Sequence, residues 1–157
     1  MKNRILILAV ALILSSCATK SSFHTFYQEN KQESDFSISV SAFIGNMFIP
    51  KKDLGEYKSL LRKAQNYDLM VFSDSEAILD KKLNKFIKRK KYSTIFRVAE
   101  NGDKVQLYFL KDNNMIKEIL LKVKSENDYV LIGAKTKILE EDLNRIIKKS
   151  ELKITSN

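Results

Sequence analysis

The chain has 157 residues, a formal net charge of +9 and an apolar content of 44%. This apolar content, with aromatic residues spread along the chain, excludes intrinsic disorder and suffices for one domain with its own core. The single cysteine leaves no possibility of an internal disulfide. The positive charge favours acidic partners, among which lipid, polymer, protein and nucleic acid are all chemically suitable.

The N-terminus divides into three zones. Met1 to Arg4 carries two basic residues and no acid, residues 5–14 contain no polar side chain, and two serines precede Cys17. A basic start, an apolar run and small residues are typical of a secretory signal peptide. The apolar run is about half of the roughly 20 residues that cross a bilayer, so we do not expect a transmembrane helix.

The end of this segment, Leu14-Ser15-Ser16-Cys17, resembles the lipobox of bacterial lipoproteins. The resemblance implies that the Cys17 thiol receives a diacylglycerol, that the peptide is cut before it, and that the new amino group is usually acylated. Two or more acyl chains anchor a protein stably, whereas one gives marginal binding. We therefore predict a signal peptide at 1–16, a lipidated cysteine with a short tether at 17–22, and a single domain at 23–157.

The residue after the cysteine, Ala18, is not acidic, unlike the inner-membrane retention signal of enteric bacteria. We therefore expect a lipid anchor in the cell envelope, on the outer membrane and facing the periplasm. The short tether would keep the domain within a few tens of ångströms of its membrane, at about 3.3–3.6 Å for each residue. Export makes nucleic acid a poor candidate for the partner.

The first predicted elements of the domain are a helix, a strand and a second helix. Ser22 is a suitable cap for a helix that carries Phe23, Phe26 and Tyr27 on one side. "DFSISV" alternates apolar residues with polar ones and predicts a half-buried strand. "SAFIGNMFIP" has apolar pairs four residues apart, which predicts a helix that Pro50 ends.

The next predicted elements are a helix, a strand and a further helix. Residues 53–65, "DLGEYKSLLRKAQ", predict a helix with the apolar stripe Leu54, Tyr57, Leu60, Leu61 and Ala64. "YDLMVF" predicts a central strand covered on both faces. Ser73 and Glu76 then have the spacing of a capping box. The helix after it has the apolar stripe Leu79, Leu83, Phe86 and Ile87.

From Tyr92 onward the apolar period is two. "YSTIFRVA" and "KVQLYFL" flank Asn101-Gly102, which is a strong hairpin pattern, and "IKEILLKV" and "DYVLIGA" follow. The last helix carries the apolar residues Leu139, Leu143, Ile146 and Ile147. The sequence therefore predicts an α+β fold with a mixed or antiparallel sheet, a C-terminal four-stranded meander, and helices mainly on one face.

Two segments carry a resemblance to a known family. "DFSISVSAFIGNMF" and "EILLKVKSENDYVLIGAKTKILEEDLNRI", together with the lipobox, resemble small Bacteroidetes lipoproteins known only as a domain of unknown function. In that family the ending reads as two strands, a glycine at the place of Gly133, and a final helix. The resemblance implies genes often encoded beside extracytoplasmic-function sigma factors, and it implies no catalytic residues.

The basic run "KKLNKFIKRKK" is the most distinctive local feature. Its positive residues lie opposite the apolar stripe of their predicted helix, and the candidates for contact with a partner are Lys81, Lys82, Lys85, Lys88 and Arg89. One interpretation is a solvated helix face. The other is contact with anionic lipid headgroups or with an acidic envelope protein.

Other chemistry-bearing residues are sparse. His24 is the only histidine, so zinc ligation and a histidine-based nucleophile relay are improbable, and we expect a surface or partly packed side chain. Glu140, Glu141 and Asp142 fit the first turn of a helix, where the dipole favours acids. We predict no metal, no cofactor and a non-catalytic binding or structural role. The alternatives are an envelope hydrolase with buried carboxylates and an accessory factor in envelope stress signalling.

Overall fold

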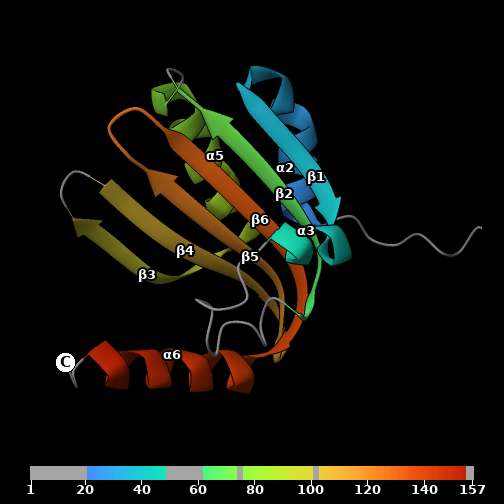
Figure 1. The fold of residues 1–157 in the computed structure, drawn as a ribbon, viewed down its shortest axis with the longest axis vertical. Coiled ribbons are helices and arrows are strands. Elements are labelled where there is room, and N and C mark those ends of the chain that lie inside the picture. The colour runs from blue at the N-terminus through green and yellow to red at the C-terminus, as the bar shows by residue number, and fades with distance from the viewer. Residues whose placement is uncertain (1–20, 49–61, 74–75, 101–102, 155–157) are drawn as a thin grey trace, which may run out of the picture.

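The computed structural model describes residues 21–48, 62–73, 76–100 and 103–154 (Figure 1). The predicted signal peptide, Cys17 and most of the predicted helix at 53–65 lie outside these residues. The end of that prediction is wrong, because Ala64 begins strand β2 and belongs to no helix. Ala64 pairs with Thr136 of a neighbouring strand, so sheet pairing decides the local conformation there.

The fold is built on one six-stranded sheet with the order β1-β2-β6-β5-β4-β3, in which all neighbours are antiparallel. The strands are β1 (Phe36–Ser41), β2 (Ala64–Phe72), β3 (Ser93–Glu100), β4 (Asp103–Asp112), β5 (Met115–Lys124) and β6 (Tyr129–Leu139). Strands β3 to β6 are sequential neighbours, so the predicted four-stranded meander is confirmed. Glu100 pairs with Asp103, as the predicted hairpin requires, while Asn101-Gly102 itself lies outside the described residues.

The described helices are α2 (Ser22–Asn30), α3 (Ala42–Phe48), α5 (Glu76–Lys90) and α6 (Glu140–Ile154), with a 3₁₀ turn η1 (Lys31–Glu33). Helices α2 and α5 cover one face of the sheet, and α6 lies across one end of it (Figure 1). The N-cap of α2 is Ser21, one residue before the predicted cap, because its hydroxyl accepts a hydrogen bond from the His24 amide at 2.9 Å.

The main core lies between the sheet and the pair α2 and α5. Its most buried members from the helices are Phe23, Phe26, Leu79, Leu83 and Phe86, and those from the strands are Met70, Phe72, Leu120, Tyr129 and Leu131. Gly133 lies beneath α2, and a Cβ atom there would come within 1.9 Å of the Phe23 ring. The glycine expected from the family resemblance thus allows the helix to approach β6 closely.

A second cluster attaches α6 to the sheet. Ile116 and Ile138 are fully buried against Leu143, and four half-buried apolar residues pack around them: Ile95, Phe109, Ile119 and Ile147. In a regular strand Ile116 and Glu118 would face the same way. The register of β5 shifts between them, so Ile116 joins this cluster while Glu118 faces α2.

Candidate functional site

The basic face of α5 is the first part of the candidate site. Lys81, Lys82, Lys85, Lys88 and Arg89 are all exposed, as the sequence predicts. The apolar stripe on the opposite side of the helix is buried, since Leu79, Leu83, Phe86 and Ile87 all belong to the main core. The helix is therefore amphipathic, and core packing fixes the direction in which its cations point.

Lys82 differs from the other cations of this face. Its ammonium lies 2.7 and 2.8 Å from the two carboxylate oxygens of Glu33 in η1. Both side chains are largely exposed, so this ion pair contributes little to stability. Within the described part of the chain, Lys81, Lys85 and Lys88 form no ion pair. Their charges remain available to a ligand.

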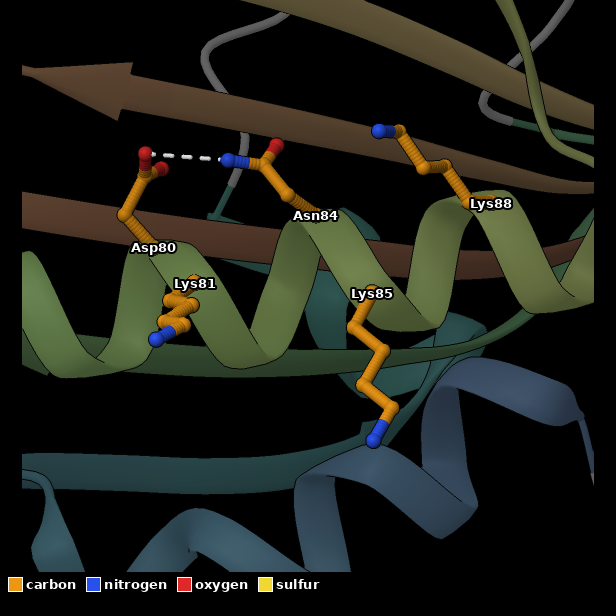
Figure 2. Close-up of a pocket in the computed structure, with 5 residues that line it drawn as sticks. All are labelled: Asp80, Lys81, Asn84, Lys85 and Lys88. Atoms are coloured by element: carbon orange, nitrogen blue, oxygen red, sulfur yellow. Dashed lines mark hydrogen bonds between the residues drawn. The ribbon is translucent and has the colours of Figure 1, made fainter.

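These three lysines line a shallow concavity of about 480 Å³ together with Asp80 and Asn84. Figure 2 shows Asp80, Asn84 and Lys88 on one side of α5 and Lys81 and Lys85 on the other. Asn84 donates a hydrogen bond of 3.1 Å to the Asp80 carboxylate, one helical turn earlier. The concavity is therefore an open strip along the helix.

A second concavity of about 320 Å³ lies between α5 and the strands β3, β4 and β5. It shares Asp80 and Asn84 with the first, and the strands contribute Arg97, Lys104, Gln106, Tyr108, Lys122 and Lys124. Strand pairing brings these residues together, because Gln106 pairs with both Arg97 and Lys122 across β4. Two residues earlier in β4, Lys104 pairs with Lys124, on the same face of the sheet. We call the two concavities together the basic groove.

The strand residues of the basic groove were not predicted from the sequence. The predicted meander contained the necessary information, since a hairpin across Asn101-Gly102 already fixes which residues of β3 and β4 are opposite each other. Basic residues in three successive strands fall on neighbouring rows of one face, which is evident only when the strands are aligned by their pairing. A run of adjacent lysines in one helix is easier to see than cations distributed over strands.

Asp80 is the only carboxylate among the described residues that line the basic groove. It accepts hydrogen bonds from Lys122, from the Tyr129 hydroxyl at 3.0 Å and from Asn84. Burial opposes ionisation, but these hydrogen bonds and the Lys122 charge outweigh it and hold the pKa of Asp80 below its ordinary value. Lys122 also lies 5.5 Å from the centre of the Tyr129 ring. Asp80 and Lys122 therefore form a structural pair at the floor of the groove.

The cations of the basic groove outnumber its carboxylates by seven to one. The seven are Lys81, Lys85, Lys88, Arg97, Lys104, Lys122 and Lys124. Such an excess attracts and concentrates anions, and lysine ammonium groups bind phosphate or carboxylate oxygens as flexible point charges. The groove is therefore strongly basic.

Two carboxylates are deeply buried under α2, and both have structural partners. Glu118 accepts hydrogen bonds from the Ser22 amide at 2.6 Å, the Phe23 amide at 2.9 Å and the Tyr92 hydroxyl at 2.6 Å. A carboxylate at this position satisfies free amides at the start of a helix and interacts favourably with its dipole. Burial, with the Glu118 charge beside it, raises the pKa of Tyr92 far above its ordinary value, so the hydroxyl remains a donor.

Asp68 is the second buried carboxylate. It accepts a hydrogen bond from the Ser39 hydroxyl at 2.5 Å and lies 3.0 Å from Nδ1 of His24. The serine and the histidine thus both contact the carboxylate, which is not the order of a nucleophile relay, where the histidine contacts the nucleophile. His24 is partly packed, as predicted, and it joins α2 to β2.

The acidic run at the start of α6 also has structural roles. Glu140, Glu141 and Asp142 lie in the first turn of the helix, as predicted. Glu140 pairs with Lys111 at 2.9 Å and Asp142 with Lys63 at 2.5 Å. Across the described ranges of the chain, no group of three or more His, Cys, Asp or Glu residues is placed to hold a metal ion. No helix in these ranges has the length and apolar content that a membrane span requires.

These observations define an antiparallel α+β domain with a basic groove on one side. By comparison of its sequence with known families, the chain belongs to the family described as a domain of unknown function, DUF4252, which matches residues 27–146. The resemblance to a family of unknown function is thereby confirmed. No curated protein and no solved structure matches the chain.

Proposed function

We propose that the protein is a lipid-anchored, periplasm-facing lipoprotein of the outer membrane that binds anionic lipid headgroups through its basic groove. Its role is non-catalytic and either binding or structural. The observation that carries the proposal is the set of exposed, unpaired cations on α5, Lys81, Lys85 and Lys88, in a chain whose N-terminus resembles a lipoprotein signal.

The shape of the groove supports an extended ligand. Small-molecule sites are enclosed and mostly apolar, with a few polar groups placed for orientation. The concavity along α5 is instead a shallow strip of lysines. Each basic residue near an anionic membrane contributes about 1 kcal/mol. An array of headgroups supplies several negative charges at once, which suits cations spaced along a helix.

The position of α5 relative to the anchor supports the same ligand. The C-terminal end of α5 leads into Tyr92, whose hydroxyl shares the Glu118 carboxylate with the Ser22 amide at the start of α2. The predicted anchor, Cys17, is only a few residues before Ser22. The basic residues Lys88 and Arg89 in the last turn of α5 therefore lie near the point where the anchor enters the fold.

The test is photocrosslinking in intact cells from a photoreactive amino acid at Asn84, which is exposed within the basic groove. We expect lipid adducts in the full-length protein and their loss when Lys81, Lys85 and Lys88 are all changed to Glu. The charge-matched control changes Arg62, Lys137 and Lys148 to Glu, since these exposed cations lie outside the groove. Adducts with one acidic protein would mean that the ligand is a protein and not a lipid. Equal yields of lipid adduct in the two triple variants would refute an electrostatic site.

The family resemblance extends the proposal to origin and context. Members of the family it resembles are Bacteroidetes lipoproteins, often encoded beside extracytoplasmic-function sigma factors, and we propose the same for this chain. A role as accessory factor in envelope stress signalling would follow from that neighbourhood. Comparing transcription of the adjacent genes with and without the protein tests this alternative, and unchanged transcription under envelope stress would count against it.

A further inference from the structure

Helix α3 and the strand before it expose several large apolar side chains. Phe43 is 80% exposed, Met47 71%, Ile44 46% and Ile38 of β1 41%. We call these four residues the α3 patch. Single exposed apolar residues are common, but a contiguous group is typical of an interaction surface. The patch contains no charged residue, and neither does any other position of α3.

The way α3 contacts the sheet explains why its apolar residues face outward. A Cβ atom at Gly45 would lie 2.6 Å from the Tyr67 ring of β2 and 3.5 Å from Val40, so the helix contacts the sheet closely at its glycine. Residues two positions away are rotated by about 200° around an α-helix. Phe43 and Met47 therefore lie on the side opposite Gly45, away from the sheet, and their exposure follows from the helix geometry.

The α3 patch lies close to the place where the N-terminal segment enters the fold. Ser21 caps His24, and His24 contacts Asp68 on one face of β2. The adjacent residue, Tyr67, points to the opposite face, as neighbouring residues in a strand do, and contacts α3. The start of α2 and helix α3 therefore lie on opposite faces of the same position in β2. In Figure 1, α3 follows the end of β1 at this position.

The length of the tether fixes how far the anchor can be from this point. Four residue steps separate Cys17 from Ser21, which at about 3.3–3.6 Å each span roughly 14 Å at most. A membrane that holds acyl chains on Cys17 thus lies near the start of α2 and near α3. A short tether also raises the effective concentration of that surface to the millimolar range. Weak apolar contacts suffice for insertion under these conditions.

We propose that the α3 patch inserts into the interfacial layer of the membrane that carries the lipid anchor. This inference rests on the proposed lipidation of Cys17. Phe and Met suit the interface because they bury apolar surface without bringing a charge or an unpaired donor into it. The patch fixes the orientation of the domain on the membrane, because it adds a second point of contact to the lipid anchor.

The test uses site-specific fluorescence in the full-length lipidated protein, reconstituted into vesicles of phosphatidylethanolamine and phosphatidylglycerol. The chain has one cysteine, and lipidation consumes its thiol, so an introduced cysteine is the only site of labelling. An environment-sensitive dye is attached at Met47→Cys or, as a control, at Phe96→Cys. Phe96 is an exposed apolar residue like Met47, but it lies outside the basic groove, on β3, at the edge of the sheet opposite β1. We expect a blue shift and quenching by brominated lipids at position 47 and neither at position 96.

The possible outcomes distinguish failure of the α3 patch to insert from failure of the lipid anchor. If the protein floats with the vesicles but the dye at position 47 matches that at position 96, the anchor stands and the α3 patch does not insert. A blue shift at position 47 without quenching by brominated lipid means that protein covers the patch, either a second copy or another segment of this chain, and overturns lipid as the occupant. Failure of the protein to float overturns the lipid anchor itself.

Discussion

At the scale of single residues, buried carboxylates determine how α2 attaches to the sheet. Glu118 is 5% exposed and holds two helix amides and the Tyr92 hydroxyl, which are contributed by elements far apart in the chain. The sequence shows an acid in an apolar strand but not its partners, because these come from the packing of α2 and α5. The buried acid of β5 thus marks the place where the start of α2 attaches to the sheet.

We predict that Glu118→Gln destabilises the fold by about 1.5–3 kcal/mol, since the neutral amide weakens three charge-assisted hydrogen bonds and turns an NH₂ group toward donors. Urea unfolding followed by circular dichroism measures the change. Glu141→Gln, at an exposed position in α6, is the control and should stay within about 0.5 kcal/mol of the original protein. Equal stability of the two variants would contradict the structural role of Glu118.

Asp80 gives a pH-dependent prediction. Its pKa is lower in the folded protein than its ordinary value, so its pair with Lys122 stabilises the fold above the unfolded pKa. This contribution is lost as pH falls through the folded pKa, below the ordinary value of 3.8. Asp80→Asn should cost about 0.5–1 kcal/mol at pH 7, allowing for solvent screening, and the difference should shrink in acid. Urea unfolding at pH 7 and in strong acid measures it. A difference independent of pH would contradict the assigned ion pair.

At the scale of elements, the end of α5 shows how the chain leaves a helix. Lys91 has a positive φ of 60°, and the amides of Lys91 and Tyr92 donate to the carbonyls of Lys88 and Ile87. This is the hydrogen-bond pattern of a helix terminated by a left-handed residue, a position that favours glycine. The sequence did not indicate it, because a lysine in a basic run has no visible conformational role.

We predict that Lys91→Gly stabilises the protein by about 0.5–1 kcal/mol, since glycine adopts this conformation without strain. Lys90→Gly is the matched control. It removes the same charge one residue earlier, inside the helix, and should destabilise by up to about 1 kcal/mol. Thermal or urea unfolding distinguishes the two signs. If both variants change stability in the same direction, the positive φ of Lys91 has no energetic importance.

The contact between Gly133 and Phe23 is the corresponding constraint on α2. Gly133→Ala should destabilise by about 1–3 kcal/mol through overpacking, since its Cβ would overlap the Phe23 ring. A smaller side chain at position 23 should relieve the overlap. In a double-mutant cycle, Phe23→Leu should therefore cost less stability with alanine at position 133 than with glycine. Additive effects in urea unfolding would mean that the two residues do not constrain each other.

At the scale of the whole molecule, the sequence predicted the fold better than the site. Strict alternation from Tyr92 onward and the hairpin pattern at Asn101-Gly102 determine local pairing, which is why the meander is confirmed. The prediction at 53–65 was wrong for Ala64, because pairing with β6 overrides a helical spacing of apolar residues there. The candidate site was half predicted: the α5 lysines follow from local periodicity, but Arg97, Lys104 and Lys122 meet only through strand pairing.

One prediction links the N-terminal segment to the folded domain. If Cys17 is the lipidated residue, Cys17→Ala leaves an unlipidated and uncleaved precursor, because both modifications require the thiol. Mass spectrometry of the full-length protein from membranes measures this. Ser16→Ala is the control, since it keeps the cysteine and a small residue before it. An unmodified Cys17 in a normally processed chain would contradict the anchor. The α3 patch would then have no membrane nearby, and its exposed Phe43 and Met47 would instead indicate a protein partner.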